Sequence, residues 1–267
     1  MPRFCLILTL ILKFHALTPA QAAAPTSTAV PSSVSIAAAA NLVYALEALN
    51  IAFRASSPEI TVTTALGASG TFVAQIKNGA PYDVFLSADL DYPHALIAAG
   101  QADARTLTPF ATGRLVLWTS HGDLPLNDIA ATVRDPSVKK LALAQPATAP
   151  YGRAAQGALA QLNLWRDAQP KIVFGENIAQ TAQFIESGHA DAGFVALSLV
   201  LSANLKNRGH WLEVPATLHA PLTQGAILTT RGAANPAARH YLAFLQSATA
   251  RAILARFGYA PPTPNTH

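Results

Sequence analysis

Ser69 lies in a turn of small residues that joins a predicted strand to a predicted helix. The strand is expected over residues 60–66, whose side chains alternate in the manner of a strand, and residues 72–76 carry apolar side chains at helical spacing. The first N–H groups of a helix have no intrahelical acceptor, and the helix dipole favours a negative charge beside them. The turn could therefore bind an anion, although capping of the helix would also explain the serine.

Three further turns join a predicted strand to a predicted helix, at Asn41, Tyr151 and Ile178. With the turn at Ser69 they place two helix N-termini in each half of the chain. None of the four contains Lys or Arg, so an anion would be bound by backbone N–H groups, the Ser69 hydroxyl and the Asn41 amide, unless Asn41 only caps its helix. Such donors, with no carboxylate among them, suit a deprotonated tetrahedral dianion (molybdate, tungstate or sulfate) better than hydrogen phosphate.

The elements that would position these turns alternate between strand and helix, which is typical of a parallel sheet. The predicted strands span residues 34–40, 60–66, 82–89, 113–118, 141–144, 171–174, 191–196 and 224–229. The helical C-terminal segment is expected to pack back on the first half. We therefore expect an α/β protein of two Rossmann-like lobes with a ligand cleft between them, lobe I comprising residues 34–113 plus 225–267 and lobe II residues 114–224.

The first 22 residues have the pattern of a secretory signal peptide. Arg3 precedes an apolar run, and Ala20-Gln21-Ala22 fits the cleavage site. A membrane anchor is the alternative, but the run is short and interrupted, which favours cleavage near Ala22. Residues 23–33 are expected to form a disordered leader. The single cysteine, Cys5, lies inside the signal, so the mature chain has no disulfide, which is compatible with a bacterial periplasm.

Charge and motifs argue against several classes of protein. The signal peptide contains two of the 18 basic residues and none of the 14 acidic ones, so the mature chain carries a net charge of only +2. This argues against binding of nucleic acid and against electrostatic binding to a membrane. The histidines show no metal-binding spacing, and the chain contains no nucleotide-binding glycine motif and no nucleophile elbow.

Several motifs resemble those of the periplasmic molybdate-binding proteins of ABC transporters, which are type II solute-binding proteins. The most specific is G-A-P-x-D-V-F-x-S-A at residues 79–88. The others, in the order of the family, are A-A-A-N-L at 38–42, G-A-S-G-T at 67–71, G-R-L-V at 113–116, P-Y-G at 150–152, G-F-V at 193–195 and F-G-Y at 257–259.

The resemblance implies a type II periplasmic-binding-protein fold that captures molybdate or tungstate and delivers it to an ABC permease in the inner membrane. It implies a periplasmic monomer that is not an enzyme and has no cofactor. By motif position, Asn41 and Ser69 donate from the first lobe, and Tyr151 and Ile178 donate backbone N–H groups from the second. The metal would be contacted only through the oxygens of molybdate. Ala196 stands where some members have a tyrosine, which leaves the fifth donor open.

Three alternatives remain from the sequence. The chain could bind another tetrahedral oxyanion, such as sulfate, with the same fold. It could be a secreted serine hydrolase that uses Ser69, which would need a histidine and an acid near that residue. It could also be a non-catalytic surface or adhesion module without a tight small-molecule ligand.

Overall fold

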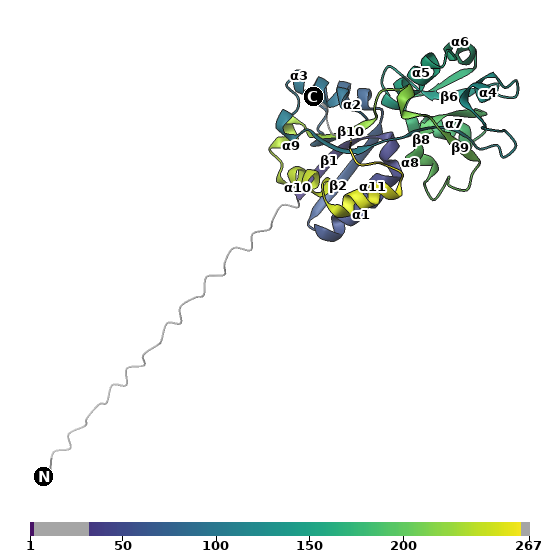
Figure 1. The fold of residues 1–267 in the computed structure, drawn as a ribbon. Helices are drawn as coiled ribbons and strands as arrows, with labels where there is room; N and C mark the ends of the chain where they lie inside the picture. Colours follow the sequence, from purple (N-terminus) through teal and green to yellow (C-terminus); the bar gives the residue numbers. More distant parts are fainter. Residues whose placement is uncertain (3–31, 263–267) are drawn as a thin grey trace. The chain divides into compact units, whose positions relative to one another are not determined.

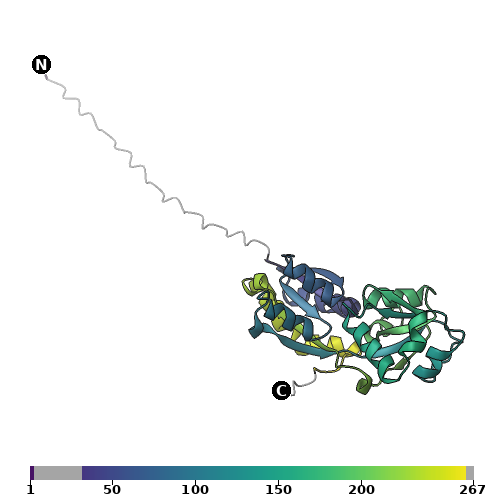
Figure 2. The ribbon, with the colours of Figure 1, turned by 90° about the horizontal axis from the view of Figure 1, so that it is seen from above.

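The computed structural model describes residues 1–2 and 32–262. The predicted signal peptide and its cleavage site at Ala22 lie almost wholly outside the described residues, as does most of the predicted leader. Residues 32–262 form two five-stranded sheets, with helices on both faces of each (Figures 1 and 2). Within these residues, no helix combines the length and the apolar character needed to cross a membrane.

The first sheet has the strand order β2-β1-β3-β10-β4, in which β1 runs parallel to β2 and β3, and β10 runs antiparallel to β3 and β4. Its strands are β1 (Ser32–Ala39), β2 (Ile60–Gly67), β3 (Val84–Ser87), β4 (Thr108–Thr112) and β10 (Thr223–Leu228). Its helices are α1 (Val43–Ser56), α2 (Ser69–Lys77), α3 (Asp91–Ala98), α9 (Thr230–Ala233), α10 (Pro236–Leu245) and α11 (Ala248–Arg256), with the 3₁₀ turns η1 (Ala40–Leu42) and η2 (Ala104–Thr106).

The central strand β1 is buried on both faces, because side chains alternate along a strand. Val34, Ile36 and Ala38 pack with apolar residues of α1, α10 and α11. Ala37 packs on the other side with residues of α2 and α3. This double burial explains why the segment is a nearly continuous apolar run, as in other parallel sheets.

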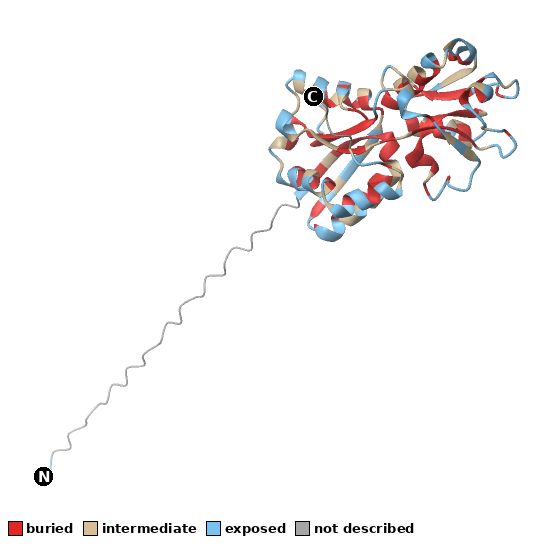
Figure 3. Cartoon of the chain, viewed as in Figure 1, coloured by how far each residue is buried: buried red, intermediate tan, exposed pale blue. Residues whose placement is uncertain are grey.

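The second sheet has the strand order β7-β6-β8-β5-β9. Its strands are β5 (Leu115–Thr119), β6 (Leu141–Ala144), β7 (Ile172–Gly175), β8 (Ala192–Ala196) and β9 (His210–Glu213). Its helices are α4 (Ile129–Arg134), α5 (Pro150–Gln161), α6 (Trp165–Ala168), α7 (Ile178–Glu186) and α8 (Leu197–Val200), with the 3₁₀ turns η3 (Gln169–Lys171) and η4 (Ala216–Leu218). The buried residues concentrate on the strands and the inner sides of the helices (Figure 3).

The predicted α/β architecture is confirmed, with differences at particular elements. β1 begins at Ser32, so Ser32 and Ser33 pair with β2 and do not belong to the leader expected over residues 23–33. β4 was not predicted because Pro109 argues against a strand, and β9 was not predicted because its residues are half exposed. The limits of the two lobes stay a prediction.

Gly193 provides a test of the packing in the second sheet. A Cβ there would lie 2.4 Å from the carbonyl oxygen of Ala142 on the paired strand β6. Gly193→Ala should therefore lower the free energy of unfolding by about 1–3 kcal/mol, as overpacking does in other cores. Urea unfolding followed by circular dichroism would measure it.

Gly157, in the interior of α5, is the matched control. The nearest neighbour of a Cβ there is 4.0 Å away, so nothing would have to move. Gly157→Ala should raise the free energy of unfolding by about 0.5–1 kcal/mol, since alanine favours the helix. A Gly193→Ala protein as stable as the control would contradict the close approach of β6 and β8.

Candidate functional site

The four residues predicted as anion donors line one small cavity. Asn41 and Ser69 reach it from the first sheet, and Tyr151 and Ile178 from the second. The other lining residues are Ala39, Ala40, Gly67, Ala68, Ala88, Ala149 and Pro150. The cavity is small: the volume open to the centre of a water molecule is only ≈ 10 Å³. It therefore suits a ligand of a few atoms.

Strand register brings the turns together in pairs. Each of the four turns follows the C-terminal end of a strand, at the junctions β1–η1, β2–α2, β6–α5 and β7–α7. In the first sheet, Ala39 at the end of β1 is paired with Gly67 at the end of β2. In the second, Ala144 at the end of β6 is paired with Gly175 at the end of β7. Neighbouring parallel strands that end at the same level place their following helix N-termini side by side, at the usual ligand edge of an open α/β sheet.

Ser69 lines this cavity and has no competing role as a helix cap. The N-cap residue of α2 is Ala68, and no side chain caps the helix. The Ser69 hydroxyl is buried and accepts a hydrogen bond from the N–H of Ala88 at 3.1 Å. Among residues 32–262 neither the hydroxyl proton nor the backbone N–H of Ser69 has an acceptor, so both can be donated to an anion.

At α7 the capping is selective. The side chain of Asn177 accepts from the N–H groups of Ala179 and Gln180, at 3.0 and 3.1 Å. The N–H of Ile178 has no acceptor in the described part of the chain. Sequence reasoning missed Asn177, although an asparagine directly before an apolar helical pattern is a strong N-cap signal.

At α5 proline has a similar effect. Pro150 is the first helical residue and has no N–H, and the N–H of Arg153 donates to the carbonyl of Ala149 at 3.1 Å. The N–H of Tyr151 lies between them and finds no acceptor within residues 32–262. Tyr151 and Ile178, the residues that the motifs indicated, thus each carry an N–H without an acceptor, and at α5 the N–H of Gly152 has none in the described residues either.

The Asn41 side chain has partners within the protein that the sequence did not predict. Its Nδ2 donates to Gln224 Oε1 and to the hydroxyl of Tyr259, both at 2.8 Å. Gln224 Nε2 donates to the carbonyls of Ala88 and Leu222, which can only accept, so the orientations of both amides are fixed. Both amide hydrogens of Asn41 are thus used inside the protein, and only its backbone N–H, which has no acceptor in the described region, is left for an anion.

Two polar atoms near the site are buried without a partner in the described residues, Asn41 Oδ1 and the Tyr151 hydroxyl. A Cβ on Gly113, which does not line the cavity, would lie 2.1 Å from that hydroxyl. The ring of Tyr151 therefore reaches past the site to the point where the chain crosses between the sheets. Burial raises the pKa of this tyrosine, and the neighbouring Tyr259 raises it further. Ala196 is buried in β8 and supplies no fifth donor.

No cavity-lining residue carries a charge, and none is a histidine. A hydrolase that used Ser69 would need a base in hydrogen-bond reach, whereas the partner of the Ser69 hydroxyl is a backbone N–H. Among the described residues, no cluster of His, Cys, Asp and Glu could hold a metal ion.

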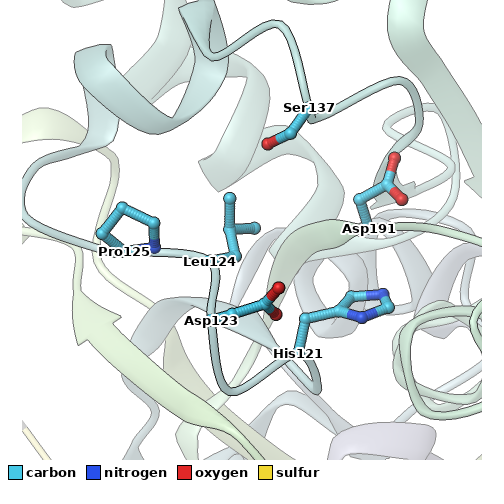
Figure 4. A pocket seen from close by; sticks show the side chains of 6 residues that line it. All are labelled: His121, Asp123, Leu124, Pro125, Ser137 and Asp191. Atoms are coloured by element: carbon cyan, nitrogen blue, oxygen red, sulfur yellow. The ribbon is translucent and has the colours of Figure 1, made fainter.

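A second, more open pocket lies in the part of the chain around the second sheet and is lined by His121, Asp123, Leu124, Pro125, Ser137 and Asp191 (Figure 4). Asp191 accepts from the backbone N–H groups of Lys139 and Lys140 at 2.7 and 2.8 Å, which gives its carboxylate a structural role. His121 and Asp123 are exposed. The pocket therefore lacks the buried, unpaired donors that distinguish the first cavity.

Comparison with known proteins agrees with this geometry. The family profile described as bacterial extracellular solute-binding protein matches residues 34–260. The molybdate-binding protein ModA of Azotobacter vinelandii is 39% identical over 198 residues, covering 74% of this chain and 78% of that protein. ModA of Rhodobacter capsulatus is 39% identical over 199 residues, covering 74% and 77%.

The solved structure of the Azotobacter vinelandii periplasmic molybdate-binding protein superimposes with a TM-score of 0.81 at 32% sequence identity, over 86% of this chain and 100% of that one. The fold, the family profile and the relatives agree, and this chain belongs to the bacterial extracellular solute-binding proteins.

Proposed function

We propose that this protein captures molybdate, and tungstate, in the periplasm and delivers it to an ABC-type permease in the inner membrane. The observation that carries the proposal is the set of unpaired N–H groups at Asn41, Ser69, Tyr151 and Ile178 around one uncharged cavity. The relatives named for molybdate binding support this ligand over other small anions. The protein acts by binding rather than by catalysis, as a monomer without a cofactor.

The chemistry of the donors supports a tetrahedral dianion. Four backbone N–H groups and one hydroxyl offer hydrogen-bond donors alone, and a fully deprotonated oxyanion offers acceptors alone. Neutral donors also leave no buried cation behind when the site empties. The N-termini of α2, α5 and α7 add the positive ends of their dipoles.

The two pairs of donors give the mechanism of capture. Asn41 and Ser69 follow strands of the first sheet, and Tyr151 and Ile178 follow strands of the second. An anion bound to Asn41 and Ser69 alone uses three of the five donors, and closure of the two lobes supplies the other two. The anion therefore stabilises the closed form, because that form makes more hydrogen bonds to it. The closed form is then the one that the permease distinguishes from the empty protein.

Calorimetric titration of the ligand-stripped protein with molybdate, tungstate, sulfate and phosphate tests the proposal. Molybdate and tungstate should bind tightly and one to one, and phosphate should not compete, because its proton needs an acceptor that the donors do not offer. Sulfate, which has shorter bonds, should bind more weakly because it cannot reach all the donors at once. Sulfate binding tighter than molybdate would make this a sulfate-binding protein, and silence from all four anions would overturn the ligand class.

Ser69→Ala tests the hydroxyl. It should weaken molybdate binding by about 1–3 kcal/mol, the usual effect of removing one hydrogen bond to a charged group. The control is Thr71→Ala, which removes an exposed hydroxyl from the same helix and should leave the affinity unchanged. Thermal melts of the ligand-free variants would separate a loss of binding from a loss of stability, since Ser69 also accepts from Ala88. Equal affinities of the two variants would remove the Ser69 side chain from the site.

A further inference from the structure

Arg153 joins the two sheets by side-chain contacts outside the anion cavity. It lies in the first turn of α5, two residues after Tyr151, and its guanidinium reaches the β3–α3 segment of the first sheet. Nη1 donates to the hydroxyl of Tyr92 at 2.9 Å, and Nη2 donates to Asp89 Oδ2. The guanidinium carbon lies 4.9 Å from the centre of the Tyr92 ring, and Asp91 is a second carboxylate at 3.8 Å.

Two further hydrogen bonds join the same segments. The Tyr92 hydroxyl donates to the carbonyl of Ala147 at 3.1 Å, and the N–H of Gly70 donates to the carbonyl of Thr148 at 2.9 Å. A Cβ on Gly70 would lie 2.5 Å from the Tyr92 hydroxyl, so a larger residue here would force this contact to shift. The turn before α5 is thus fixed against both α2 and α3. These contacts exist only while the two lobes are together.

Hydrogen bonds within the β3–α3 segment leave one carboxylate oxygen of Asp89 for a cation. Asp89 Oδ1 accepts from the Ser87 hydroxyl and from the N–H of Tyr92, both at 3.2 Å and both within its own segment, which leaves Oδ2 for Arg153. The Asp89 side chain is only 9% exposed, compared with 38% for Arg153. Burial raises the pKa of Asp89, and the Tyr92 N–H and the charge of Arg153 lower it in part. A carboxylate this buried is costly without a cation beside it.

The position of Arg153 in its helix also indicates that it needs a carboxylate from the other lobe. A cation in the first turn of a helix faces the positive end of the dipole, and the first turn of α5 contains no acidic residue of its own. The compensating carboxylates, Asp89 and Asp91, come from the other lobe. Each partner is therefore poorly compensated when the lobes separate, and both are compensated when they meet.

We propose that Arg153, Asp89 and Tyr92 form an electrostatic clasp that holds the lobes closed around the anion and slows its release. This inference rests on the proposed capture of an oxyanion. Arg153 does not line the anion cavity, so it is a positioning residue that acts on the closing equilibrium. The apparent affinity is proportional to the population of the closed form, so loss of the clasp weakens binding by the factor by which it shifts closure.

The clasp predicts a separation of rates that a merely structural role would not give. Asp89→Asn breaks the ion pair and leaves the positive charge of Arg153 two residues from the Tyr151 N–H, so molybdate release should accelerate on the order of tenfold while association is not slowed. Arg153→Met should accelerate release by a similar factor and also slow association at low salt, because a charge that attracts the anion is gone. Stopped-flow displacement of bound molybdate measures both rates.

Coupling and rescue complete the test. The double variant Asp89→Asn/Arg153→Met should release molybdate no faster than either single variant, because the two side chains act as one pair. Arg153→Lys should restore part of the slow release, since lysine keeps the charge but not the fork that contacts Tyr92 and Asp89 together. Arg134→Ala is the matched control, as it breaks the ion pair with Asp167 that joins α4 to α6, two helices packed around the second sheet.

The outcomes are distinguishable. Wild-type protein that binds molybdate tightly, with release unchanged in Asp89→Asn and Arg153→Met, overturns the clasp and leaves the proposed function standing. Additive effects in the double variant also overturn it. Wild-type protein that binds none of the four anions overturns both. If Arg153→Met fails to fold, the comparison of Asp89→Asn with Arg153→Lys gives the same decision.

Discussion

The site depends on backbone N–H groups that the fold buries and leaves unpaired. A buried N–H without an acceptor is costly, so proteins rarely leave one free. Here four such groups belong to residues that line one cavity, and at α7 the surrounding sequence pairs the neighbouring groups. Asn177 caps the two N–H groups after Ile178, and Pro150 removes the one before Tyr151. An anion in the cavity would satisfy the remaining groups together, so the cost of the empty site becomes affinity for the ligand.

A second constraint is the polar network where the chain crosses between the sheets. The Asn41 amide, Gln224 and Tyr259 are buried and bonded to one another, and Ser198, just after β8, donates to the carbonyl of Asn41 at 2.8 Å. The network thus binds the β1–η1 junction to both sheets. It holds the backbone of Asn41, which lines the cavity and whose N–H has no acceptor in the described residues. The Asn41 side chain holds the backbone in place through Gln224 and Tyr259, so it can serve the site without donating to the ligand itself.

Much of this arrangement could be predicted from the sequence, for physical reasons that the residues show. Apolar strand runs followed by small residues and helical patterns located all four turns, since these signals are local. The role of the Asn41 amide could not be predicted, because its partners Gln224 and Tyr259 are about two hundred residues away in the chain. The pairing of Asp89 with Arg153 could not be predicted for the same reason, since the two residues lie far apart in the chain.

The distribution of charge between the cavity and its surroundings follows from these constraints. A cation inside the cavity would bind the anion more strongly but would be left buried and unpaired on release. The fold instead keeps charge out of the cavity and places Arg153 two residues beyond the Tyr151 N–H, where it remains partly exposed to water. When the lobes are apart, water compensates the charge of Arg153 only in part. On closure the carboxylates of Asp89 and Asp91 lie beside it, and the cavity itself holds its anion with neutral donors alone. Hydrogen bonds inside the cavity recognise the anion, and an ion pair outside it favours closure. Because the two tasks fall to different groups, the site can be selective for one anion and still release it.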